Sequence, residues 1–65
     1  MDEVEKLRVL IPHWIEHNVE HADEFREWAV RAGAAQEDLE AAAAALKAVN
    51  EHLQVALQKL GGVRA

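Results

Sequence analysis

The chain has 65 residues, a net charge of −5 and a hydrophobic fraction of 51%. A chain of this length forms one domain at most and buries only roughly 60% of its unfolded surface, so a single core is marginally stable. The acidic balance argues against nucleic acid and anionic membranes as partners, because both select clustered Lys and Arg, and a sequence without Ser, Thr, Tyr or Cys has no hydroxyl or thiol nucleophile.

Apolar residues recur at steps of three and four along residues 2–32, which predicts one amphipathic helix. Two polar residues, Asn18 and His21, interrupt the stripe, and a second row widens it along one edge at Ile15, Ala22 and Ala29. We expect the stripe to be the buried side of the helix. Its apolar members are Val4, Leu7, Ile11, Trp14, Phe25, Trp28 and Ala32.

Pro12 lies inside this predicted helix. It has no N–H to donate to the carbonyl of Arg8, and its ring disfavours helical geometry at Ile11. Two arrangements fit these constraints: a kink in one continuous helix, or a break that leaves residues 2–10 as a short separate helix. The apolar phase runs through Pro12 unchanged, which favours the kink.

A turn at about residues 33–35 precedes a second helix at about residues 36–60. Gly33 suits the left-handed conformation that ends many helices, and the acidic pair Glu37 and Asp38 favours a helix start. The second helix ends at Gly61 and Gly62. It carries the most regular stripe in the sequence: Leu39, Ala42, Leu46, Val49, Leu53, Ala56 and Leu60.

A turn this short makes the two helices antiparallel. The predicted fold class is therefore all-α, with residues 1–65 forming a single helical hairpin. Each apolar face is wider than one helix contact covers, and Trp14 and Trp28 are especially bulky. Two hairpins packed as a four-helix bundle would bury both faces, so we expect a homodimer.

The first helix also carries a four-residue repeat of the form His-x-x-Glu, three times over. A four-residue step advances about 400°, so successive repeats drift by only about 40° around the helix. Two histidines four residues apart can bind one metal ion from one helix face. The row consists of His13, His17 and His21, with Glu16, Glu20 and Glu24 beside them.

The fourth histidine, His52, belongs to the second helix. With the turn centred near Ala34, residue i lies beside a residue near 69 minus i, which places His52 level with His17. Three imidazoles would suit Zn, Ni, Co or Cu. The predicted ligands are His17, His21 and His52, with Glu20 or Glu24 as a fourth and with His13 further round the helix.

A structural role for the same residues is the alternative. A polar layer of Asn18 and His21 would fix the register or the oligomeric state, as a single core Asn does in coiled coils. His17 and His52 would then form hydrogen bonds at a subunit interface. A pH-sensitive interface is a third interpretation of these histidines.

The segment His13-Trp14-Ile15-Glu16-His17-Asn18, followed by His21-Ala22 and Phe25-Arg26-Glu27-Trp28-Ala29, resembles a short prokaryotic domain family without an assigned activity. The resemblance covers about His13 to Leu60. It implies a helical fold that occurs alone or appended to larger proteins, and it supplies no catalytic residues.

The sequence therefore predicts a non-enzymatic protein that binds a divalent transition metal as a carrier, sensor or storage module. The alternative is an oligomerisation or adaptor module, with a second copy or another protein as its partner. No run approaches the roughly 20 apolar residues that span a bilayer. The start, Met1-Asp2-Glu3, is acidic and unlike the basic start of a secretory signal, so a cytoplasmic location is expected.

Overall fold

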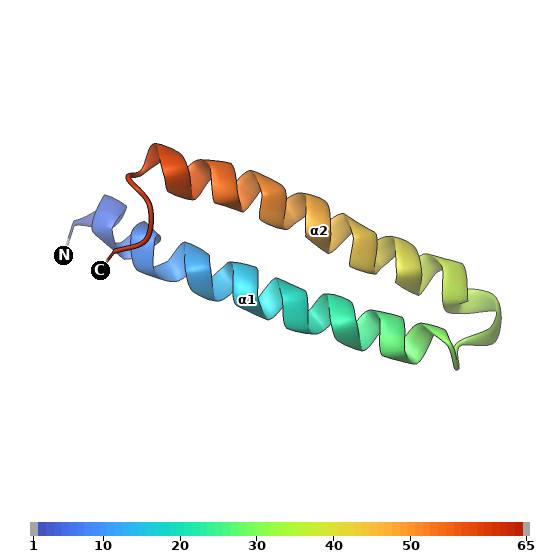
Figure 1. The fold of residues 1–65 in the computed structure, drawn as a ribbon. Helices are drawn as coiled ribbons and strands as arrows, with labels where there is room; N and C mark the ends of the chain where they lie inside the picture. The colour runs from blue at the N-terminus through green and yellow to red at the C-terminus, as the bar shows by residue number, and fades with distance from the viewer. Residues whose placement is uncertain (1, 65) are drawn as a thin grey trace.

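The computed structural model describes residues 2–64, which form a two-helix hairpin with extents of 46 × 15 × 15 Å (Figure 1). Helix α1 spans Glu3–Ala29, a short 3-10 helix spans Gly33–Ala35, and helix α2 spans Gln36–Lys59. The two helices pack along each other, and residues 2–64 contain no strand. The all-α hairpin predicted from the sequence is confirmed.

The ends of the helices are closed by local hydrogen bonds. Asp2 is the N-cap of α1, and its Oδ1 accepts a hydrogen bond from the backbone N–H of Glu5 at 2.8 Å. At the end of α2, Gly61 has a φ of 102°, and its N–H donates to the carbonyl of Gln58. The N–H of Gly62 donates to the carbonyl of Leu57 at 2.9 Å, which completes a Schellman motif.

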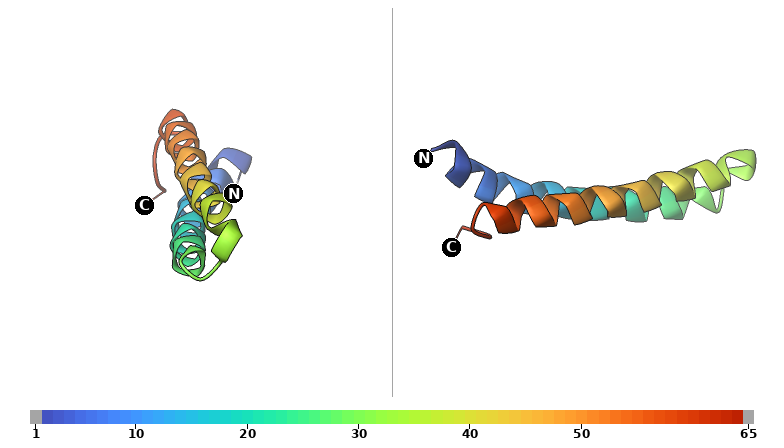
Figure 2. Two further views of the ribbon diagram at one scale, coloured as in Figure 1. Left: turned by 90° about the vertical axis from the view of Figure 1, so that its right-hand side faces the viewer. Right: turned by 90° about the horizontal axis from the view of Figure 1, so that it is seen from above.

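Helix α1 is continuous through Pro12. The missing N–H and the ring of Pro12 weaken the helix locally, and the first turns of α1 lean away from α2 in the right-hand view of Figure 2. The rest of α1 runs beside α2 to the turn, where Gly33 has the expected left-handed conformation, with a φ of 56°.

The contact between the helices, called the seam here, is built on small side chains. Three of its five buried residues are alanines, which let two helix backbones approach closely. No large side chain within residues 2–64 is fully enclosed, as expected for a hairpin that has only one helix contact. The five are Ile11, Ala22, Ala29, Ala43 and Leu57.

The predicted buried stripe on α1 was wrong in part: Ile11 is buried and Leu7, Phe25 and Ala32 are half-buried, but the tryptophans lie outside the seam. Trp14 and Trp28 are 43% and 58% exposed, and His21 is exposed as well. The centre of the seam is the row through Ala22 and Ala29, which the sequence had placed at the edge of the stripe. Indole rings cannot fit between two helices that approach across alanines, so α1 is rotated and both indoles lie on its flank.

The buried side of α2 is also rotated relative to the predicted stripe. Val49, a member of the predicted stripe, is 43% exposed, whereas Ala43 is completely buried and Leu57 is 5% exposed. Asn50 is half-buried at the seam. The apolar surface of α2 therefore extends beyond the part that α1 covers.

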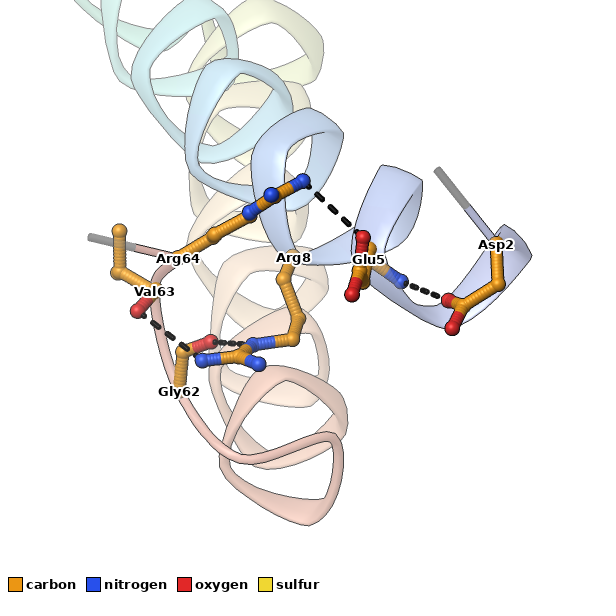
Figure 3. A network of polar contacts seen from close by, with 6 residues as sticks. All are labelled: Asp2, Glu5, Arg8, Gly62, Val63 and Arg64. Carbon is orange, nitrogen blue, oxygen red and sulfur yellow. Dashed lines mark hydrogen bonds and ion pairs between the residues drawn. The ribbon is translucent and has the colours of Figure 1, made fainter.

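Arg8 ties the open end of the hairpin together (Figure 3). Its Nε donates to the carbonyl of Gly62 at 2.8 Å, and its Nη2 reaches the carbonyls of Gly61 and Val63 at 3.5 and 3.4 Å. Beside it, Nη1 of Arg64 lies 3.2 Å from Oε2 of Glu5. This group, the arginine clamp, joins the first turns of α1 to the segment that follows α2.

Replacing Arg8 with methionine is expected to lower the free energy of unfolding by about 1–2 kcal/mol. The variant keeps an apolar stem but leaves the backbone carbonyls without their cationic donor. Arg26→Met is the matched control, because Arg26 makes only an exposed pair with Asp23, and such pairs contribute little. Urea midpoints measured by circular dichroism compare the two. Equal midpoints would contradict a stabilising clamp.

Candidate functional site

One flank of the hairpin carries large apolar side chains that remain about half exposed. Trp14, His21 and Trp28 are spaced seven residues apart and therefore lie in one row along α1. Leu10 is 42% exposed. The guanidinium carbon of Arg31 lies 4.6 Å from the ring centroid of Trp28, a cation–π contact that shields part of the indole.

The side of the hairpin opposite to this row can be identified from a cavity. A shallow cavity of about 150 Å³ lies there, between Val19 and Arg26 of α1 and Lys47 of α2, with the amides of the seam at its floor. At 100° per residue, Trp14 lies on the other side of α1 from Val19, and Val49 lies on the other side of α2 from Lys47. Both tryptophans and Val49 are therefore exposed on the same side of the hairpin. This side, called the tryptophan face, carries Leu10, Trp14, His21, Trp28 and Val49.

A polar pair lies within the seam. Nδ2 of Asn18 donates to Oδ1 of Asn50 at 2.9 Å, and Nδ2 of Asn50 donates to the carbonyl of Ile15 at 3.2 Å. Asn18 was predicted in the seam, but its partner was missed. The signal was present, because Asn50 lies four residues after Leu46 and three before Leu53. The polar layer therefore consists of two amides, and His21 lies outside it.

Two histidines of the predicted site each face a carboxylate one turn further along α1. Nδ1 of His17 lies 3.9 Å from Oε2 of Glu20, and Nδ1 of His21 lies 3.5 Å from Oε1 of Glu24. All four side chains are more than half exposed. Both contacts use Nδ1, which leaves the Nε2 atoms of His17 and His21 without a contact in either pair.

His13 and His52 are exposed on α1 and α2. Within residues 2–64, no group of three or more His, Asp or Glu side chains is placed so that it could hold a metal ion. The structure thus brings His17 and His21 together on α1, each with its own carboxylate, and it does not gather His52 into a group with them. One hairpin presents a pair of imidazoles.

A comparison with known proteins identifies a family to which the chain is similar. A family model described as "Domain of unknown function (DUF8180)" matches residues 7–60. No curated protein and no solved structure matches the chain. Neither α1 nor α2 is long and apolar enough for a membrane crossing, so residues 2–64 hold no candidate span.

Proposed function

We propose that the chain, which belongs to the DUF8180 family, is a self-association module whose hairpin pairs with a second copy to form a four-helix bundle. The observation that carries the proposal is the exposure of Trp14 and Trp28, 43% and 58%, on the same flank. Complete burial of one tryptophan removes roughly 150–250 Å² from water, so covering two indoles that are about half exposed removes roughly that area in total and favours association. The proposed role is non-enzymatic.

The size of the tryptophan face fits a second copy. One long side of the hairpin, 46 × 15 Å, has a footprint of about 700 Å², close to the roughly 800 Å² per partner of a standard interface. The row on α1 is flanked on α2 by Val49 and by exposed alanines such as Ala45. Small residues let a second pair of helices approach closely. In the bundle each helix has two neighbours, and the marginal core of the single hairpin is completed.

Sedimentation equilibrium of the metal-free chain tests the proposal. The wild type is expected to be a dimer at micromolar concentration, and the double variant Trp14→Gln/Trp28→Gln a monomer. Val19→Gln is the matched control, because Val19 is 49% exposed on the opposite flank and the variant should remain dimeric. A monomeric wild type, or a control that dissociates as readily as the tryptophan variant, would overturn the proposal.

A further inference from the structure

A row of residues along α1 and just beyond its end is symmetric in spacing about His21. Phe25 and Ala32 of this row are half-buried and the other members are exposed, and Ala32 follows the end of α1 at Ala29. Counted from Leu10, its members follow one another at steps of four, three and four residues up to His21, and then at four, three and four again. Two copies of such a row can pair with themselves in opposite directions, because residue i of one copy then lies level with residue 42 minus i of the other. The members are Leu10, Trp14, His17, His21, Phe25, Trp28 and Ala32.

This pairing places large side chains against suitable partners. Trp14 of each copy lies level with Trp28 of the other. His21 lies on the two-fold axis, opposite the His21 of the second copy. On α2 the same axis passes near Lys47, because Asn18 and Asn50 mark the levels of the two helices. Ala45 and Val49 then flank the axis, where their small side chains allow α2 to meet its own copy.

The two histidines of each copy leave the same ring nitrogen available for a metal ion. The carboxylates of Glu20 and Glu24 lie 3.9 and 3.5 Å from Nδ1 of His17 and His21, which are ion-pair distances and longer than good hydrogen bonds. Both Nε2 atoms are left for the ion, and the spacing of four residues lets them chelate it together. One hairpin supplies no third ligand, since residues 2–64 hold no group of three.

The second copy supplies that ligand. With the two-fold axis at His21, Glu24 of the other copy lies level with position 18, between His17 and His21. His17 and Glu24 are seven residues apart, so they lie on the same edge of α1, and the two-fold axis keeps them on the same edge of the paired helices. One oxygen of Glu24 faces His21 of its own chain at 3.5 Å, and the other oxygen remains for the ion.

We propose that each dimer binds two divalent transition ions, each held by His17 and His21 of one copy and Glu24 of the other. The proposal rests on the self-association proposed above. Two imidazoles and one carboxylate, with water in the fourth position, are a ligand set that suits Zn²⁺ and Co²⁺ in tetrahedral geometry. His13 and His52 take no part, since His13 lies further round α1 and His52 is on α2.

Titration of the purified full chain with Zn²⁺ and Co²⁺, followed by calorimetry and by the visible spectrum of Co²⁺, tests the ligands. The wild type is expected to bind one ion per chain at micromolar concentration. Glu24→Gln should weaken binding by at least about tenfold, and His17→Ala/His21→Ala should abolish it. His13→Ala and His52→Ala are the matched controls and should bind as the wild type does. Unchanged binding by Glu24→Gln would overturn the shared site.

A mixed dimer tests whether Glu24 acts across the interface. One chain carries His17→Ala/His21→Ala, the other carries Glu24→Gln, and two affinity tags isolate the mixture. The Glu24→Gln chain keeps its histidine pair, and the other chain keeps Glu24, so one complete site is expected per mixed dimer. Affinity clearly above that of Glu24→Gln alone, at half the ion content of the wild type, supports the proposal, and affinity no better than that of Glu24→Gln alone overturns it.

Sedimentation in chelator separates this proposal from the one on which it rests. A wild type that is dimeric in chelator but binds neither ion refutes the metal site and leaves self-association standing. A wild type that is monomeric in chelator refutes self-association of the metal-free chain, whether or not added Zn²⁺ then binds or joins two copies.

Discussion

The Leu57→Ala variant is expected to lose most of its helical signal at room temperature. Leu57 is one of two large residues among the five that are buried, at 5% exposure. Truncation of such a side chain costs about 2–5 kcal/mol, and a single core in a chain of this size supplies no more than about 3–5 kcal/mol. The free energy of unfolding that the seam supplies is therefore too small to compensate for this destabilisation.

Far-UV circular dichroism with urea titration, at one fixed chain concentration, measures this effect. The concentration must be fixed because association stabilises the folded state by mass action. Val55→Ala is the matched control on the same helix: Val55 is 48% exposed, and surface substitutions usually change stability by less than about 0.5 kcal/mol. If the two variants had the same urea midpoint, the seam would not be the core of the fold.

Asn50→Ala is expected to destabilise the chain by about 1–3 kcal/mol, because the half-buried amide of Asn18 loses its acceptor and remains desolvated. The double variant Asn18→Leu/Asn50→Leu is expected to be as stable as the wild type or more so, since an apolar pair of similar shape has no unsatisfied group. The coupling energy of the two amides is the effect of Asn18→Leu/Asn50→Leu on the free energy of unfolding minus the summed effects of Asn18→Leu and Asn50→Leu alone.

The double variant is also expected to lose its single helix register and to populate several oligomeric states. A buried amide pair penalises any alignment in which its members do not meet, so it fixes the register of the helices. Sedimentation velocity should show a broader distribution of oligomers for Asn18→Leu/Asn50→Leu than for the wild type. A double variant less stable than Asn50→Ala would show that the amides contribute to stability directly.

The hairpin itself could be predicted because its signals are local. The glycine turn, the acidic start of the second helix and the two apolar stripes together allow only an antiparallel pair. The sequence also predicted which residues of the two helices lie opposite each other. A turn centred near Ala34 places residue 51 beside Asn18, and the observed partner is Asn50.

The rotation of each helix could not be predicted from the same pattern. On α1 the row with Trp14 and Trp28 and the adjacent row with Ala22 and Ala29 are both apolar, so periodicity alone cannot decide between them. The choice depends on how closely the two backbones approach, which is a property of the pair. Trp14 and Trp28 were placed in the seam by their spacing, and the size of their indoles is the reason they lie outside it.

Only part of the candidate site could be predicted, because the sequence shows the spacing of residues along a helix and not the contacts of their side chains. The spacing of His17 and His21 placed them together on one helix face, and the structure adds the carboxylates that face their Nδ1 atoms. The arginine clamp had no signal in the sequence. Its geometry depends on the path of the chain after Gly61, which is set by two successive residues with positive φ.

The position of the arginine clamp determines how the hairpin responds to force. Both ends of the described chain lie at the same end of the molecule (Figure 1), and the clamp is the first group of contacts between them. Tension applied across the two ends therefore unzips the helices from this end and breaks the seam contacts one after another, where a shearing geometry would load them all at once. We therefore expect the hairpin to open at low force and to close again starting from the turn.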